Sequence, residues 1–387
     1  MVLRSKRDYL DSIRLRYRNA SRHAKGLILD EFCATCGYHR KYAIRLLRKT
    51  KRKAQVGSQR KRPGPVSTYQ QPELVATLKR LWFATDQMCS LKLKAAIPLW
   101  LPFYEQEHGP VAEPIKAKLL TASASTLDRL LKPFRTEHPK GRCTTKPGTL
   151  LKNQIPIKTG HWDVTCPGFF EADTVAHCGN SMAGDFVYSL TFTDILTGWT
   201  ENRAVWGRGS YRVLQSIQEI EAGLPFPILG FDCDNGSEFL NHHLVRYFTD
   251  RPKHPVSFTR SRPNRKNDNA FVEQKNWTHV RQLLGYERFD TPALVPLIND
   301  LYRNEWRLYT NLFCPTLKLK TKVKINAKYR KTYEPPQTPY QRILQSCTVN
   351  PEAKARLAEQ CDPLNPFVLK RHIEEKLKQI FFLAKLP

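Results

Sequence analysis

The chain of 387 residues is poor in acidic side chains and contains no long apolar segment. It has 35 Asp and Glu against 63 Lys and Arg, which gives a formal net charge of +28. A deficit of acid on this scale favours a polyanionic partner, bound less tightly as the salt concentration rises. Charge alone leaves open a basic protein of the ribosome or of a membrane surface.

The sequence also lacks the segments that address a protein to a membrane or to an oxidising compartment. No run approaches the roughly 18 apolar residues of a membrane span, and the first residues lack the apolar core of a signal peptide. We therefore expect a cytoplasmic protein with no membrane partner. The ten Cys are scattered, which favours reduced thiols. Cys33, Cys36 and His39 are spaced as in zinc sites, but no second ligand pair follows nearby, so we expect the two cysteines to be small buried residues in a helical turn.

Acidic residues stand out where their neighbours are apolar. One apolar run ends in Asp232 and Asp234, directly before an Asn-Gly pair, which is typical of a buried strand that ends at a turn. Upstream, Asp173 lies within a strand-like segment, residues 168–176. A carboxylate in such a setting is costly unless it is paired or binds a metal.

A third carboxylate, Glu273, follows a basic loop that contains proline, residues 260–266. An Asn-Asp-Asn cluster comes next and is suited to capping a helix. Glu273 then falls in the first helical turn, where a negative charge is favourable. Three carboxylates at one point repel one another unless cations neutralise them, and oxygen ligands suit Mg²⁺ or Mn²⁺.

These segments resemble the retroviral-integrase-like catalytic domain of DDE transposases, as found in bacterial insertion sequences. Asp173 stands before Thr174, Asp234 before Asn-Gly, and Glu273 within Phe-Val-Glu-Gln-Lys-Asn, and the match covers about residues 155–290. The resemblance implies an α/β core with an RNase H-like mixed sheet. In that fold the first Asp lies on the first strand, the second ends the fourth strand, and the Glu opens a long helix.

The resemblance also implies a function. Asp173, Asp234 and Glu273 are the expected catalytic and metal-binding residues, with two Mg²⁺ or Mn²⁺ ions as cofactor. The expected reactions are hydrolysis at the ends of a mobile element and joining of the 3′-hydroxyls to target DNA. The expected partners are double-stranded DNA and further copies of the chain, and the expected location is the bacterial cytoplasm, at the nucleoid when DNA is bound.

Alternatives stay open for the residues and for the function. Asp232 shares the face of Asp234 and is a rival metal ligand. Asp194 lies at a predicted turn, where Asp is more often structural, and His177 faces the side of Asp173 if the strand continues. A non-catalytic, sequence-specific DNA-binding regulator derived from a transposase would keep only the DNA-reading parts. A metal-dependent nuclease would use the same ions to cut without joining.

Two helical modules are predicted ahead of the acidic segments. Residues 22–49 are predicted to form two helices around Gly37, the layout of a helix-turn-helix whose second helix enters a major groove. A small helical bundle with solvated charges is the alternative. Helical periodicity returns in residues 71–135, where Ser125 is predicted to begin a capping box and a second helix-turn-helix-like module is expected.

The last part of the chain is predicted to form a small C-terminal module with a helical tail. Residues 317–325 alternate between Lys and mostly apolar residues, so a strand there carries Lys on one face. Such a face suits the tracking of phosphates, and a basic extended linker is the alternative. The predicted boundaries are 1–50 and 71–135 for the helix-turn-helix modules, 51–70 and 136–158 for linkers, 159–300 for the catalytic domain and 301–387 for the C-terminal region.

The predicted DNA contacts are basic residues of the first helical module, the linker, the second module and the segment around Glu273. They are His39, Arg40, Lys41, Arg45, Arg60, Lys61, Arg62, Arg129, Arg260, Arg262, Arg265, Lys266 and Lys275. Many relatives in the transposase family carry Lys or Arg four or seven residues after the Glu. This chain has Trp277 and Val280 there, so the resemblance does not extend to those two contacts.

Overall fold

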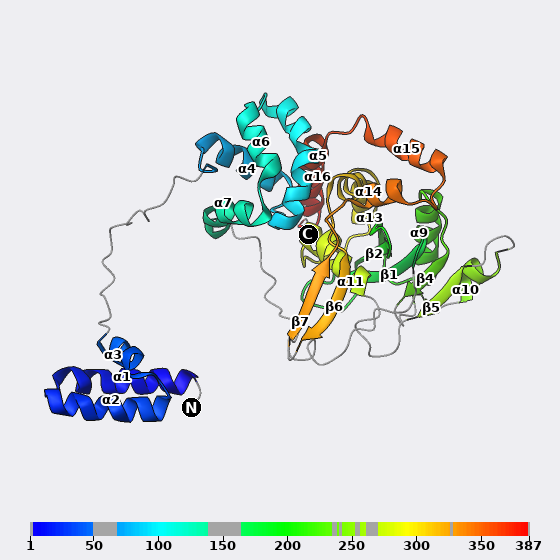
Figure 1. Cartoon of the computed structure of the whole chain (residues 1–387). Helices are drawn as coiled ribbons and strands as arrows, with labels where there is room; N and C mark the ends of the chain where they lie inside the picture. Colours follow the sequence, from blue (N-terminus) through cyan, green and yellow to red (C-terminus); the bar gives the residue numbers. More distant parts are fainter. Residues whose placement is uncertain are drawn as a thin grey trace. The chain divides into compact units, whose positions relative to one another are not determined.

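A computed structural model of the chain describes most of the sequence (Figure 1). The described residues are 3–48, 68–137, 164–233, 238–239, 242–251, 256–260, 270–325 and 328–385. The chain divides into two compact units, Met1–Val66 and Ser67–Pro387. Within the described ranges, no helix is long and apolar enough to cross a bilayer.

The first unit contains three helices around a small core. They are α1 (Leu3–Asn19), α2 (Arg22–Cys36) and α3 (Arg40–Arg48). Ser21 caps α2, and Gly37 ends it with φ of 67°, a conformation that glycine adopts without strain. The two helices on either side of Gly37 agree with the sequence, whereas α1 was not predicted. Cys36 is buried in the core, and its burial raises the pKa of the thiol.

The second unit begins with four helices. They are α4 (Pro72–Ala84), α5 (Ser90–His108), α6 (Glu113–Thr121) and α7 (Ala124–Glu137). The predicted capping box at Ser125 is wrong, because α7 begins at Ala124 and Ser123 supplies the cap. Its Oγ accepts a hydrogen bond from the backbone N–H of Thr126 at 3.1 Å. Asp128, the other predicted member of that box, pairs with Arg135 at 2.7 Å.

A mixed five-stranded sheet forms the centre of the second unit (Figure 1). Its strands are β1 (Phe169–Ala176), β2 (Val187–Asp194), β3 (Thr200–Trp206), β4 (Gly230–Cys233) and β5 (Ser257–Arg260), in the order β3-β2-β1-β4-β5. The first three strands pair antiparallel, and β4 and β5 continue the sheet parallel to β1. Between the strands lie α9 (Ser210–Ala222), which leads from β3 to β4, and α10 (His242–Thr249), which lies between β4 and β5. The mixed sheet, its hairpin and the following helix were expected from the sequence.

A long helical segment closes the edge of the sheet at β3. It consists of α13 (Leu294–Leu301), η2 (Tyr302–Trp306) and η3 (Tyr309–Phe313). The side-chain amide of Asn299 accepts from the backbone N–H of Ala204 at 2.7 Å and donates to its C=O at 2.8 Å. Asn311 makes the same two bonds with Thr200, each at 2.9 Å. These amides replace a neighbouring strand, and the predicted boundary at residue 300 falls inside the segment.

The C-terminal part contributes a hairpin and three helices. They are β6 (Leu319–Ile325), β7 (Lys328–Tyr333), α14 (Pro339–Gln345), α15 (Pro351–Cys361) and α16 (Pro366–Leu383). The predicted Lys-rich strand is confirmed as β6. Helix α16 packs against α5, α13 and η2, and Trp100 of α5 donates to the C=O of Phe313 at 2.9 Å. The four first helices and the sheet therefore share one hydrophobic core.

Candidate active site

A helix that begins at Ala270 packs across β1 and β2. It runs through α11 (Ala270–Lys275), η1 (Asn276–Arg281) and α12 (Gln282–Leu284) without a break. Val272 and Val280 are fully buried and attach the helix to the core, whereas Glu273 is exposed. The middle of the helix is π-helical, a form found frequently at functional sites.

Asp173 of β1 lies beside this helix. Nδ2 of Asn276 donates to Oδ2 of Asp173 at 2.6 Å, and the backbone N–H of Thr174 donates to Oδ1 at 2.7 Å. Asn276 follows Glu273 by three residues, and residues at this spacing lie on one face of a helix. The fold therefore brings two of the three predicted carboxylates, Asp173 and Glu273, to the same side of the sheet.

Glu171, two residues before Asp173 on the same face of β1, holds the start of the helix. Its Oε2 accepts hydrogen bonds from the backbone N–H groups of Phe271 at 3.0 Å and Val272 at 2.9 Å. These N–H groups have no partner inside a helix, so a carboxylate satisfies them well. Burial, together with the negative charges of Asp232 and Glu273, raises the pKa of Glu171 to about 8.

Asp232 belongs to β4, the strand that leads toward Asp234. It pairs across the sheet with Glu171, is buried, and accepts a hydrogen bond from Oγ1 of Thr259 at 3.1 Å. The next pair in this register is Ala172 with Cys233, the residue directly before Asp234. Asp234 itself lies outside the described residues, so the choice between Asp232 and Asp234 stays a prediction.

Glu238, like Glu171, is an acidic residue near the site that was not singled out from the sequence. Glu238 is buried and accepts a hydrogen bond from Oγ1 of Thr174 at 2.9 Å, and Nε of Arg208 lies 3.9 Å from it.

Glu171 could have been found from the alternation of β1, because it shares a face with Asp173. The contact made by Asn276 joins residues far apart in the sequence and gave no local signal.

His177 and Asp194 have structural roles. Asp194 is fully buried and accepts from the backbone N–H groups of Gly168 at 2.8 Å and Thr197 at 2.7 Å, which fixes the turn after β2. His177 is also fully buried and shares a hydrogen bond of 2.8 Å with Oγ of Ser189. Burial lowers the pKa of His177 to about 3. The sequence favoured a structural role for both residues.

Lys275 does not face solvent. Its side chain is buried, and Nζ donates to the C=O of Gly198 at 3.1 Å and lies 3.3 Å from Nε2 of His279. Burial, together with the positive charges of Lys92 and Arg342, lowers the pKa of Lys275 to about 7. The predicted contact between Lys275 and DNA does not fit this position, because the ammonium group is buried and bonded within the core.

The remaining predicted DNA contacts fall into two groups. The exposed ones are His39, Arg40, Lys41 and Arg45 in the first unit, and Arg129 on α7. Arg40 pairs with Asp30, and the Arg45 guanidinium lies 5.0 Å from the ring centre of Tyr42. Arg60, Lys61, Arg62, Arg262, Arg265 and Lys266 lie outside the described residues, and at Arg260 only the backbone is described.

The donor set at β1 and α11 fits a hard divalent cation. Carboxylate oxygens are the ligands that Mg²⁺ and Mn²⁺ prefer. Glu171 interacts electrostatically with Asp232 and Glu273, so the three acidic side chains lie near one another at this side of the sheet. Among the described residues, no group of three or more His, Cys, Asp or Glu side chains is arranged to hold a metal, and Asp234 lies outside that part of the chain.

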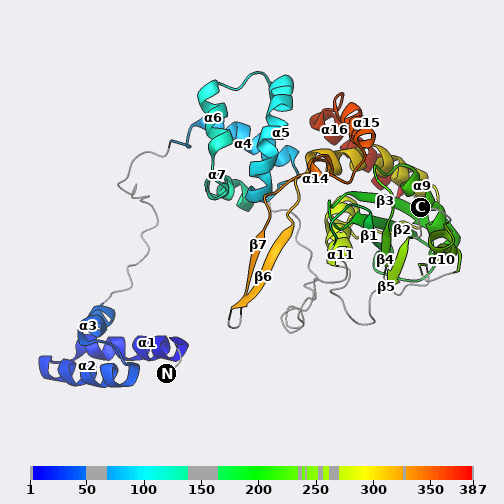
Figure 2. The same cartoon turned by 45° about the vertical axis from the view of Figure 1, so that its right-hand side comes forward.

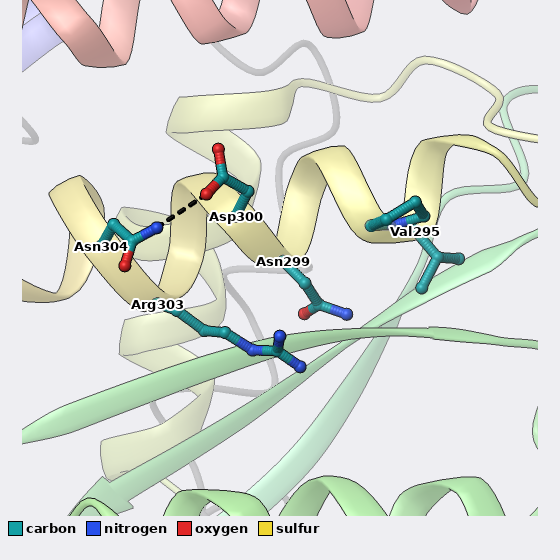
Figure 3. A pocket seen from close by; sticks show the side chains of 6 residues that line it. Val295, Asn299, Asp300, Arg303 and Asn304 are labelled. Carbon is teal, nitrogen blue, oxygen red and sulfur yellow. Dashed lines mark hydrogen bonds between the residues drawn. The ribbon is translucent and has the colours of Figure 1, made fainter.

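A cavity of about 520 Å³ lies elsewhere, along α13 and η2 (Figure 3). Its one carboxylate, Asp300, accepts from Nδ2 of Asn304 at 2.7 Å and pairs with Lys376 at 2.5 Å. Asn299, which also lines the cavity, is occupied at the edge of β3. The residues that line this cavity form no set of catalytic groups. The candidate active site therefore remains the acidic face, by which we mean Glu171 and Asp173 of β1 and Glu273 of α11.

Comparison with models of known protein families finds no match. The chain is 40% identical over 339 residues to the uncharacterized protein y4rM of Sinorhizobium fredii, an alignment that covers 87% of this chain and 94% of y4rM. The chain belongs to the y4rM family. Because y4rM is described only as uncharacterized, membership of the y4rM family brings no activity with it.

Among solved structures, the chain is similar to two integrase catalytic core domains. One is that of HTLV-2 integrase in complex with magnesium, in a dimeric form, with 15% identity, a TM-score of 0.28, and coverage of 39% of this chain and 90% of that chain. The other is that of BIV integrase, with 15% identity, a TM-score of 0.28, and coverage of 46% and 95%. Superpositions with so low a TM-score carry no argument about the function of this chain. The mixed five-stranded sheet is established by the order and direction of its own strands.

Proposed function

We propose that the chain is a DNA strand transferase of the transposase type. It would cut phosphodiester bonds at the ends of a mobile element and join the 3′-hydroxyls to target DNA. The observation that carries the proposal is the hydrogen bond between Asn276 and Asp173, because Asn276 lies about one helical turn after Glu273. Asp173 belongs to β1, which pairs with β4, the strand that leads to Asp234.

Asp173, Asp234 and Glu273 are the proposed metal ligands. Bound Mg²⁺ or Mn²⁺, two ions in all, would activate the attacking hydroxyl and stabilise the leaving oxygen. The protein's own contribution is orientation. Asn276 fixes one oxygen of Asp173, and Glu171 fixes the helix start from which Glu273 projects. Rigid support of this kind is what positions catalytic groups.

DNA is the proposed partner because of charge and exposure. The net charge of the chain is +28, and helix α3 of the first unit exposes several basic residues. We assign this unit to reading of the element ends, in the manner of a helix-turn-helix. Assembly of several copies on DNA and action at the bacterial nucleoid belong to the same proposal.

Nicking of supercoiled plasmid in the presence of Mg²⁺ or Mn²⁺ tests the chemistry. Glu273→Gln keeps the shape of the side chain and removes a metal ligand, so nicking should fall on the order of 10³-fold. Glu359→Gln, at an exposed position of α15, is the matched control and should nick like the unchanged chain. Equal loss in both variants, or nicking that persists in EDTA, would overturn the proposal.

A further inference from the structure

The hairpin of β6 and β7 stands clear of the rest of the second unit (Figure 2). It forms a separate sheet of two strands. Lys331 is exposed on one face, and Val323 and Arg330, which pair with each other, are exposed on the opposite face. Lys320, at an irregularity in the pairing, is also exposed. The apolar side chain of Val323 is 54% exposed. Both faces of the ribbon are therefore open.

The charges of this ribbon make it unstable without a partner. From Lys318 to Tyr333 the chain carries seven basic residues and no acidic one. The backbone pairing sets Lys322 opposite Lys331, and like charges in directly opposite positions destabilise a hairpin. An isolated two-stranded ribbon is marginally stable in water. A polyanion along the ribbon would remove the repulsion.

The base of the ribbon is fixed to the turn between β2 and β3. Nζ of Lys318 donates to the C=O of Leu196 at 3.1 Å. Nη1 of Arg342, from α14, donates to the C=O of Thr197 at 3.0 Å. Thr316 and Gln337 close the base with a backbone hydrogen bond of 2.8 Å. The ribbon therefore has a rigid root on the central sheet.

The same turn is tied to the helix that carries Glu273. The C=O of Gly198 accepts from Nζ of Lys275, two residues after Glu273. Three consecutive carbonyl groups, from Leu196 to Gly198, thus hold the start of the ribbon, α14 and α11 together. The root of the ribbon consequently has a fixed position relative to the acidic face.

We propose that the β6–β7 ribbon enters the major groove of duplex DNA and holds the duplex in register with the acidic face. The major groove, about 12 Å wide, admits a two-stranded β-ribbon. Lys and Arg contact the phosphates, while Thr, Val and Tyr side chains are available to the base edges. A second copy of the chain is disfavoured as the occupant, because its net charge is also +28. The alignment of the duplex with the acidic face rests on the proposed transferase function, whereas the binding of DNA by the ribbon does not.

The salt dependence of DNA binding tests the charge contribution. Lys320, Arg330 and Lys331 are changed to Gln together in the full chain, and Arg356, Lys378 and Lys385, exposed on or just after α15 and α16, are changed to Gln as the control. The probe is a mixed-sequence duplex of four turns, about 40 base pairs. Each lost phosphate contact lowers the slope of log K against log salt by about 0.9, so the ribbon variant should lose up to about 2.7. Equal slopes in the two variants would overturn the proposal.

Photocrosslinking tests entry into the groove. A benzoylphenylalanine placed at Val323 should crosslink to the duplex, whereas the same group at Phe382, 70% exposed on α16, should not. Duplex RNA should compete poorly, because its deep and narrow major groove does not admit a ribbon. A crosslink to a second copy of the chain, or equal competition by RNA and DNA, would contradict the proposal.

These tests are independent of catalysis. Crosslinking at Val323 in a chain that neither nicks nor joins DNA would uphold the ribbon and overturn the transferase. Nicking and joining without a crosslink would uphold the transferase and overturn the ribbon.

Discussion

Glu171 is buried and accepts hydrogen bonds from the backbone N–H groups of Phe271 and Val272, of which the bond from Val272 is buried and that from Phe271 partly buried. Glu171→Ala should therefore lower the free energy of unfolding by about 2–3 kcal/mol, because one buried and one partly buried donor lose their acceptor. Urea titration measures this change. Glu171→Gln keeps an acceptor oxygen for these two N–H groups, so it should keep most of the stability. Equal losses for Ala and Gln would contradict the role assigned to the carboxyl oxygen.

His177 makes the fold sensitive to acid. Its pKa is lowered by burial to about 3 from an ordinary 6.5, so the unfolded chain takes up a proton that the folded chain excludes. This contribution to stability is complete above the unfolded pKa and is lost as the pH falls toward the folded pKa. From pH 7 to pH 5 the loss should be about 2 kcal/mol.

The matched variants separate this histidine from others. His177→Gln can still bond Ser189 but does not titrate, so its stability should fall less between the two pH values. His372→Gln, at an exposed position, should behave like the unchanged chain. Urea unfolding at each pH gives the comparison, and identical pH dependence in all three proteins would refute the assignment.

Single residues were predictable where the chain itself supplies the context. Asp173 and Glu273 were singled out because an apolar strand and a helix start make a carboxylate conspicuous, and their catalytic role stays a prediction. The burial of Lys275 was missed because it depends on Gly198, a turn residue 77 positions away that accepts its hydrogen bond. Asp234 was preferred because it precedes Asn-Gly, and Asp232 remained a rival because residues two apart share a face of a strand.

At the scale of elements, the edge of β3 depends on side-chain amides in place of a strand. Asn299→Ala would leave the N–H and C=O of Ala204 without partners in the core, at a cost of about 2–4 kcal/mol in the free energy of unfolding. Asn304→Ala removes an exposed amide of the same helical segment and should cost less than about 0.5 kcal/mol. Chemical denaturation of both variants checks this, and comparable losses would argue against a role of Asn299 at the sheet edge.

The five strands followed from alternation and from the glycine and proline residues between them. Element starts were harder: Ser125 was predicted to cap the helix that Ser123 caps, two residues earlier. The predicted boundary at residue 300 falls inside α13. Nothing local shows that Asn299 and Asn311 bind β3, and these contacts make the helix part of the core.

At the scale of the whole molecule, the two compact units should fold separately. A fragment of residues 67–387 should unfold cooperatively at the same urea concentration as the corresponding transition of the full chain, because the hydrophobic core of the second unit lies entirely within it. Tryptophan fluorescence follows this transition, since the first unit contains no Trp. A shift of the midpoint by more than the error of the titration would show that the units stabilise each other.

The central claim is that the acidic face of β1 and α11 performs strand transfer on DNA. The most direct measurement is Mg²⁺-dependent joining of labelled duplexes, taken from the two flanks of the gene, to a plasmid. Asp173→Asn should abolish joined product and retain binding of the labelled duplex, whereas Asp362→Asn, exposed at the end of α15, should join like the unchanged chain. Joining that survives in Asp173→Asn would contradict the account, and duplex binding without cutting or joining in the unchanged chain would favour a DNA-binding regulator.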